Sequence, residues 1–280
     1  MVFFIIHDAA GQTSPVGRPS SGDRKAACDL IEATLQKPND EKHAAGQLNQ
    51  YQKTSEHVLK LCPNNIVVTQ VLKEAMAKAT KAKSDRQAAK VLALALRDAQ
   101  ETLAFKPFIE AALPEGFPEP TPVGEIQLKH YPTYRMARTQ MAGAETGAFW
   151  ILFTHIKKKD ISMTAPVEMT YSATGKDELQ GQSMGFLYSS TKQGEAGKDE
   201  QVEVVDIPAM MAASFGIRGD VTKARLAEAK AHLDVWLKQH ADEFEASGPL
   251  RVMGYNSPFV AASRRYAEVQ IPVGRITKPR

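Results

Sequence analysis

The sequence has few cysteines, no long apolar run and little net charge, and each of these absences excludes a class of protein. Its 280 residues contain two cysteines, Cys28 and Cys62. Two thiols exclude a disulfide-rich scaffold and multi-cysteine zinc or iron–sulfur sites, and they leave either one bridge or two free thiols in helices. No stretch approaches the ~18 consecutive apolar residues that a membrane-spanning helix needs. The net charge of +3 gives no polybasic signature that would predict binding to nucleic acid or an anionic membrane.

The common motifs of hydrolases and nucleotide-binding proteins are also missing. None of the seven histidines belongs to a His-Glu-x-x-His metal motif. The sequence contains no Gly-x-Ser-x-Gly nucleophile elbow, no Walker loop and no Gly-x-Gly-x-x-Gly after a predicted strand. We therefore assign no catalytic residues from motifs.

The apolar start of the chain bears on its compartment. Residues 1–6 are apolar, but the run stops at His7 and Asp8 and lacks a basic n-region. It is also shorter than the roughly 7–15 residues of a signal h-region. We expect a cytoplasmic protein. The alternative is that the true start lies upstream and that this stretch is the tail of an export signal ending near residues 9–11.

A change in composition near residue 113 predicts a domain boundary. Hydrophobic residues make up 43% of the chain, which is the globular range, and the length suits two domains. Residues 113–124 carry four prolines. Because proline removes backbone donors and disfavours helix in the residue before it, this segment is expected to be an extended linker or an ordered arm. It separates a region 1–112 from a region 125–275.

The first region has helical periodicity. Apolar residues spaced by three or four predict helices over 48–62, 68–79 and 87–103, and residues 22–37 give a fourth candidate. Ser84 to Gln87 fits a capping box, in which two side chains satisfy free backbone N–H groups at a helix start. The region is therefore predicted to be a small helical bundle.

The second region predicts a repeated order of strands and helices. Strands are expected at 125–141, 161–171, 183–190, 202–216, 250–260 and 266–273, and helices at 146–158 and 221–240. This is a duplicated β-α-β-β unit. Residues 130–134 correspond to 206–210, and residues 162–167 correspond to 255–259. The seam between two such halves is a natural place for a concave apolar pocket.

Two elements of this region could take part in ligand binding. His130 precedes Tyr131 and Pro132 in a predicted strand, and a neutral imidazole is a good ligand for iron. The alternative is an ordinary surface histidine, because the strand alternation is compatible with either face. Arg264 and Arg265 could pair with ligand carboxylates, or they could belong to a hairpin turn.

Four segments together resemble the SOUL, or heme-binding protein, family. They are EIQLKHYP at 125–132, ISMTAPV at 161–167, GYNSPF at 254–259 and RYAEVQI at 265–271. The resemblance covers about residues 123–275 and does not reach the helical region. It implies an α+β protein, with the helical bundle followed by a distorted β-barrel of duplicated β-α-β-β units. Such a barrel is similar to the effector-binding domains of some bacterial transcription regulators.

The resemblance also implies a ligand. The family binds heme or related tetrapyrroles in an apolar groove, here expected to be a non-covalent b-type heme. In one branch a histidine in a His-Tyr element is proposed as the axial iron ligand, and His130 with Tyr131 occupies that position. Other members hold heme by apolar contacts and basic side chains. We therefore expect His130, Tyr131, Met163 and Arg265 to bind the cofactor, with His130 on the iron.

The leading interpretation is a heme-binding protein for carriage, buffering or sensing. One alternative is a ligand-sensing regulator, because a helical region with a basic stretch at 73–97 precedes the barrel, although no helix-turn-helix signature is visible. A second is a small-molecule hydrolase that uses Glu168 and Tyr171 as acid or base. A third is an interaction module assembled through the bundle. The expected partner is heme or a porphyrin, nucleic acid is not expected, and the sequence predicts no oligomeric state.

Overall fold

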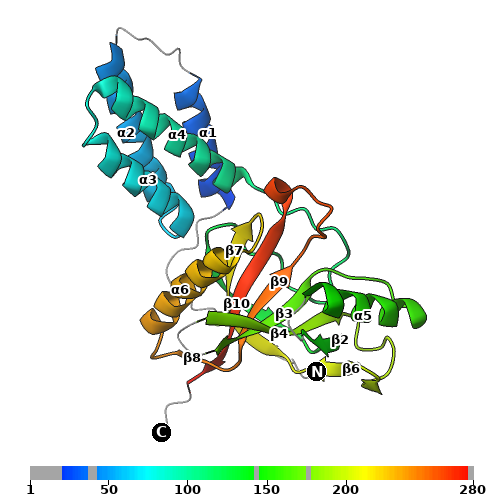
Figure 1. Ribbon diagram of the computed structural model, residues 1–280. Helices are drawn as coiled ribbons and strands as arrows, with labels where there is room; N and C mark the ends of the chain where they lie inside the picture. The colour runs from blue at the N-terminus through cyan, green and yellow to red at the C-terminus, as the bar shows by residue number, and fades with distance from the viewer. Residues whose placement is uncertain (1–20, 37–42, 142–144, 175–177, 277–280) are drawn as a thin grey trace, which may run out of the picture.

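The computed structural model describes residues 21–36, 43–141, 145–174 and 178–276. Figure 1 shows that the chain forms a helical bundle followed by a single large sheet with two further helices. Among these residues, no helix combines the length and apolarity needed to cross a membrane.

The four predicted helices form the bundle. They are α1 (Ser21–Leu35), α2 (Ala44–Leu61), α3 (Ile66–Ala79) and α4 (Asp85–Ala104). Their periodic apolar positions meet in one core, in which Ile31, Val58, Leu72, Leu92 and Leu96 are fully buried. Ser84 is the N-cap of α4 as predicted, and its hydroxyl accepts a hydrogen bond from the Gln87 amide at 3.3 Å. The reciprocal bond of the predicted capping box is shifted by one residue, because the Gln87 side chain accepts from the Lys83 amide at 3.1 Å rather than from Ser84.

The ten strands form one antiparallel sheet. They are β1 (Ile126–Tyr131), β2 (Tyr134–Gln140), β3 (Val167–Thr174), β4 (Glu178–Leu187), β5 (Gly197–Asp199), β6 (Val202–Ile207), β7 (Met210–Arg218), β8 (Phe244–Ala246), β9 (Leu250–Gly254) and β10 (Tyr266–Arg275). Their order is β1-β7-β10-β9-β3-β4-β2-β6-β5, and β8 pairs with β10. The prediction of a barrel is corrected here, because the described sheet is open. A closed barrel requires its end strands to pair with each other, whereas β1 and β5 each pair with one neighbour.

The sheet order reproduces the predicted duplication. It is symmetric about the β9–β3 pair, so that β1 corresponds to β6, β2 to β7, β3 to β9 and β4 to β10. The predicted single strands 125–141 and 202–216 are each two strands, separated at Pro132 and Pro208. Proline cannot donate to a ladder, and the chain turns at each one. As a result, β1 pairs with β7 and β2 with β6, each across to the other half.

Three boundaries of the predicted strands are wrong by five residues or more, and one of them is the start of β4, predicted at 183 and found at Glu178. The strand predicted at 161–171 begins at Val167, after the cis bond between Ala165 and Pro166. The strand predicted at 250–260 ends at Gly254, so Tyr255–Phe259 follows a strand whereas residues 162–166 precede one. The corresponding positions are instead Pro166 and Pro249, each of which immediately precedes a strand.

The two faces of the sheet are covered differently. Helix α5 (Glu145–Lys158) packs on β4 and β2, and α6 (Lys223–Gln239) packs on β10 and β7. A short 3₁₀ turn, η2 (Ala262–Arg264), precedes β10. The opposite face of the sheet, which we call the inner face, is covered by residues 105–124, which we call the arm. Its apolar side chains pack against an inner cluster that includes Tyr131, Tyr134 and Met253.

The bundle is joined to the end of the arm at the start of α3. The Asn65 side chain accepts a hydrogen bond from the Val68 amide at 3.0 Å and donates one to the Val123 carbonyl at 2.8 Å. The Ile66 amide donates to the Gly124 carbonyl at 2.7 Å. Gly124 has φ +78°, and a Cβ atom there would lie 2.5 Å from the Asn65 side-chain oxygen. The close approach therefore requires glycine.

Candidate functional site: a buried polar cluster beneath the arm

A fully buried carboxylate, Glu268 on β10, lies at the centre of one half of the cluster. It is paired with the Lys129 ammonium of β1 and accepts a hydrogen bond from the Thr121 backbone amide at 2.6 Å. Its second oxygen accepts hydrogen bonds from the Tyr255 hydroxyl at 2.8 Å and the Gln270 amide at 3.0 Å. Burial alone would raise the pKa of Glu268, but Lys129 and these donors outweigh it and lower the pKa below its usual value.

A second buried ion pair, between Arg251 on β9 and Glu168 on β3, lies in the same cluster. One terminal nitrogen of Arg251 donates to Glu168 at 3.1 Å and to the Tyr134 hydroxyl at 2.9 Å. Its Nε donates to the Gln270 side chain at 2.9 Å, and Gln270 in turn donates to the Tyr131 hydroxyl at 2.7 Å. Gln270 therefore links the two ion pairs. The other terminal nitrogen of Arg251, Nη2, is buried without a hydrogen-bond partner among the described residues.

The cluster is built for holding hydrogen bonds rather than for moving protons. Burial raises the pKa of Tyr131 and of Tyr134, so both hydroxyls stay protonated and can donate. Each carboxylate is matched by one cation. Burying such charges is costly unless they are paired and hydrogen-bonded, and this arrangement meets that condition.

The arm covers the polar cluster on the inner face of the sheet. The Phe117 ring meets the rings of Tyr131 and Tyr134 edge to face, with centroids 5.1 and 5.2 Å apart. The Tyr266 hydroxyl donates to the Thr121 carbonyl at 2.5 Å. Polar side chains from both halves of the sheet are thus covered by a segment that belongs to neither.

The structure does not bring the four predicted cofactor residues together. His130 is exposed on the edge strand β1, opposite Met211 of β7. Its strand neighbours Ile126 and Leu128 pack into the apolar cluster beneath α6. Tyr131 is buried on the opposite face, in the inner cluster beneath the arm, because successive side chains of a strand alternate between faces.

Met163 and Arg265 lie elsewhere. Met163 is half-buried and packs with the cluster beneath α5. The Arg265 guanidinium donates to the carbonyls of Val260 at 2.7 Å and Pro258 at 2.6 Å, and it pairs with Asp220 at 2.5 Å. It therefore ties down the loop between β9 and β10.

Glu168 and Tyr171, the two residues considered for a hydrolase, each interact with other side chains rather than with each other. Glu168 is held by Arg251 and by the Tyr134 hydroxyl, which donates to it at 2.8 Å. The Tyr171 hydroxyl lies 3.5 Å from a Glu145 oxygen, and burial together with that carboxylate raises its pKa to about 12. Neither side chain offers a free base.

Sequence reasoning missed the members of the cluster. Lys129, Arg251, Glu268 and Gln270 received no role there, although each is a polar residue inside a predicted strand. Arg251 and Glu268 are flanked by apolar residues on both sides, and a buried charge in an apolar strand needs a partner. The apolar neighbours of Arg251 and Glu268 could therefore have indicated two buried charges with partners.

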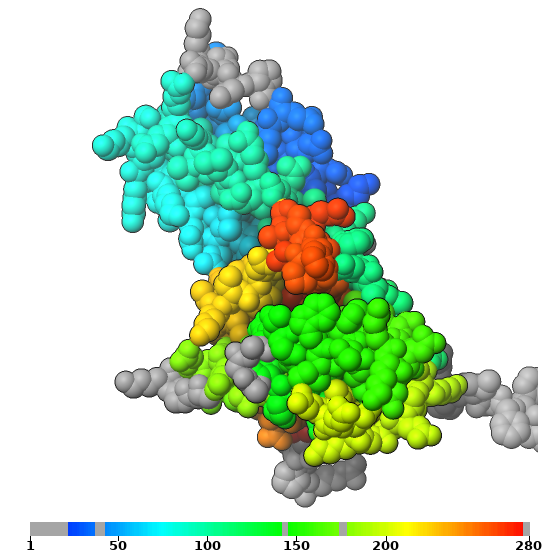
Figure 2. All heavy atoms as spheres, turned by 45° about the vertical axis from the view of Figure 1, so that its right-hand side comes forward, coloured from blue at the N-terminus to red at the C-terminus, as the bar shows by residue number. Residues whose placement is uncertain are grey.

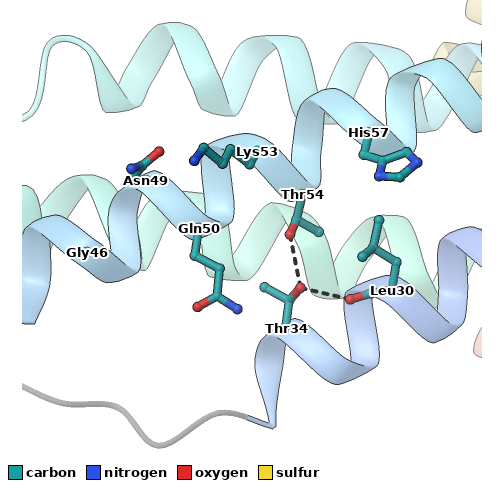
Figure 3. A pocket seen from close by; sticks show the side chains of 8 residues that line it. All are labelled: Leu30, Thr34, Gly46, Asn49, Gln50, Lys53, Thr54 and His57. Carbon is teal, nitrogen blue, oxygen red and sulfur yellow. Dashed lines mark hydrogen bonds between the residues drawn. The ribbon is translucent and has the colours of Figure 1, made fainter.

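An open pocket lies in the bundle. Figure 3 shows it between α1 and α2, lined by Leu30, Thr34, Gly46, Asn49, Gln50, Lys53, Thr54 and His57. The Thr34 and Thr54 hydroxyls lie 2.9 Å apart at its floor. In the described part of the chain, no group of three or more His, Cys, Asp or Glu side chains could hold a metal ion.

A comparison with protein-family models finds a match in the second region of the chain. A family model described as "SOUL heme-binding protein" matches residues 120–272. No curated protein matches the chain.

Several solved structures are similar to the chain. The EcmrR C-terminal domain is 16% identical over 54% of this chain and 98% of that one, with a TM-score of 0.42. EcmrR in a DNA complex is 13% identical over 83% and 85%, with a TM-score of 0.43. A hydrolase from Listeria innocua is 12% identical over 55% and 94%, with a TM-score of 0.40.

Proposed function

Because the chain belongs to the SOUL heme-binding protein family, we propose that it binds heme or a related tetrapyrrole for carriage, buffering or sensing. The family match over residues 120–272 is the observation that carries the proposal. Both cysteines, Cys28 and Cys62, lie outside that range. The Cys-x-x-Cys-His motif of c-type heme attachment is missing from the sequence, so we propose a non-covalent, b-type heme.

The described residues favour binding at the surface over binding in an enclosed cavity. The inner face of the sheet is filled by the arm and the polar cluster. On the outer side, α5 carries three aromatic rings in mutual contact, of which Trp150 is 57% exposed. Figure 2 shows the green segment that contains this helix on the near face of the molecule. A flat macrocycle could lie against such rings. The Lys157 ammonium, 5.6 Å from the centre of the Phe153 ring, is placed to meet a propionate.

Three of the four predicted residues take roles in this proposal. His130 is the proposed iron ligand, since its imidazole is exposed and a neutral ring nitrogen can bind iron. Met163 is proposed as an apolar contact beside the α5 rings. Tyr131 would anchor the strand that presents His130. Arg265 takes no part in this proposal, because its neighbour Tyr266 pairs with Arg218 of β7 whereas His130 pairs with Met211, roughly 23 Å away along the same strand. Bound heme supplies redox and spectral properties that no side chain has.

Hemin titration tests the proposal. We expect the wild-type chain to shift the Soret band of hemin, His130→Ala to alter that band, and Met163→Ala to weaken binding. His57→Ala is the matched control, because His57 is an exposed histidine of the bundle, outside the family match. An unchanged band in His130→Ala would remove that ligand. Absence of hemin binding by the wild-type chain would overturn the proposed function.

One contact favours a different ligand-sensing role, for a ligand that binds beneath the arm rather than on the outer surface. The arm that covers the polar cluster is bonded through Val123 to Asn65 at the start of α3. A ligand that displaces the arm would therefore also change its contact with α3 of the bundle. A ligand-sensing regulator is accordingly the second candidate, and salt-dependent binding of the full chain to duplex DNA would test it.

A further inference from the structure

The middle of the arm is a short flap between two anchored ends. Before it, the Ala112 carbonyl accepts a hydrogen bond from the Ala165 amide at 3.1 Å. After it, the Thr121 amide donates to Glu268 at 2.6 Å. The flap, residues 114–120, is joined to the loop that follows β4 by a 2.9 Å bond from the Glu115 amide to the Ser189 carbonyl. It turns at Gly116, where φ is +73°.

Phe117 of the flap fills a slot that has features of a binding site. The walls are the rings of Tyr131 and Tyr134, whose centres lie 5.1 and 5.2 Å from that of Phe117 and whose planes stand at 71° and 83° to it. The Arg251 guanidinium lies 4.8 Å from the centre of the same Tyr131 ring. This side chain is 98% buried, yet its Nη2 has no acceptor among the described residues. A buried donor without a partner costs free energy that an incoming acceptor would recover.

The charges of the cluster select the kind of ligand. Glu168 is already paired with Arg251, and Glu268 with Lys129. A cationic ligand would find both carboxylates occupied. The free hydrogen-bonding capacity is a donor on a cation, which a carboxylate or carbonyl oxygen satisfies best.

We propose that the slot filled by Phe117 is a ligand site for a flat aromatic molecule that carries a carboxylate or carbonyl acceptor. The aromatic ring of the ligand takes the place of Phe117 between the tyrosines, and its acceptor binds Nη2 of Arg251. The flap fills the slot when the ligand is absent and moves out when the ligand binds. The site shares only Tyr131 with the heme proposal, in which that residue anchors β1 without contacting the ligand, so either proposal can fail without the other.

Benzoate is a suitable probe, with toluene and benzamidine as its acceptor-free and cationic counterparts. The affinity of the full chain for each is measured by calorimetry, and hydrogen exchange reports the Glu115 amide. Gly116→Ala disfavours the closed flap, because a residue with a Cβ atom is strained at positive φ. Since closure competes with the ligand, we expect benzoate to bind the variant roughly five-fold more tightly. Gly147→Ala on α5, where a new Cβ meets no atom within 4 Å, is the matched control and should leave the affinity unchanged.

Different results would support the proposed site and overturn it. Tighter benzoate binding in Gly116→Ala alone, weaker binding of toluene and faster exchange of the Glu115 amide on adding benzoate would support the site. Equal benzoate affinity in Gly116→Ala and the wild-type chain would overturn it. So would tighter binding of benzamidine than of benzoate, or Glu115 exchange that benzoate leaves unchanged. Hemin is absent from all of these measurements.

Discussion

Replacing Lys129 with methionine removes the cation from a fully buried ion pair while keeping most of the side-chain volume. The side chains of Lys129 and Glu268 are 3% and 0% exposed. Water therefore cannot take over the role of the ammonium. Breaking a buried pair by removing one partner typically costs about 3–5 kcal/mol, because the remaining charge is left uncompensated.

The other donors to Glu268 place the expected cost at the lower end of that range. The carboxylate keeps its hydrogen bonds from Thr121, Tyr255 and Gln270. We therefore expect Lys129→Met to lower the free energy of unfolding by about 3 kcal/mol at pH 7. In the double variant Lys129→Met/Glu268→Gln no charge is left behind, and we expect a loss of about 1 kcal/mol.

The two variants should also differ in their dependence on pH. In the wild-type chain the pKa of Glu268 lies below its ordinary 4.5, so the pair stabilises the fold above that pH and is lost as the pH falls through the lower, folded-state pKa. Without Lys129, burial dominates and raises the pKa above the unfolded value. A raised pKa gives stability below the unfolded pKa that is lost as the pH rises. The deficit of Lys129→Met should therefore be smaller at pH 5 than at pH 7.

Urea unfolding followed by tryptophan fluorescence measures these changes in the right region. The chain has two tryptophans, Trp150 on α5 and Trp236 on α6. Both helices pack on the sheet, so the signal reports the region that contains the ion pair. If the double variant is as unstable as Lys129→Met, or if the deficit is the same at pH 5 and pH 7, the reasoning about an uncompensated charge is refuted.

Two further predictions concern the bundle. Asn65→Ala removes both the cap of α3 and the bond to the Val123 carbonyl, so we expect it to lower the free energy of unfolding, measured by thermal unfolding, by about 2 kcal/mol. The control Ser84→Ala removes only a cap and should cost about 1 kcal/mol. Equal losses in the two variants would contradict a role for Asn65 in joining the two regions. Burial raises the pKa of Cys62 to about 11. In a Cys28→Ser background, the Cys62 thiol should therefore react slowly with a disulfide reagent at pH 8 until urea is added. Rapid reaction of the folded protein would show that the thiol is not buried.

The helices could be predicted because their positions depend on local spacing. Leu92, Leu96, Ala99 and Leu103 of α4 recur at intervals of three or four and are all buried. The strand prediction at 161–166 failed although the residues suit a strand. The Thr164 hydroxyl there bonds the Leu187 carbonyl at 2.6 Å, and the segment lies outside the ladder, a tertiary arrangement that no local pattern encodes.

The polar cluster could be predicted only in part. The sequence shows that Arg251 and Glu268 lie in apolar strands, but it does not show their partners. Lys129 and Glu268 are 139 residues apart, and Glu168 and Arg251 are 83 residues apart. These pairs exist because β1, β7 and β10 are neighbours and because β3 pairs with β9. The crossing of strands between the halves, set by the turns at Pro132 and Pro208, therefore determines the site.

The duplication explains why Glu168 and Arg251 differ. Met169 and Val252 lie directly opposite each other where β3 pairs with β9, and each follows its charged residue in an equivalent position of its half. A symmetric pair of units brings equivalent residues together at that point. Two identical halves would therefore bury two like charges within ion-pair distance, which is strongly unfavourable. The fold can bury charge here only if the halves differ, and the acidic residue on β3 and the basic residue on β9 meet that requirement.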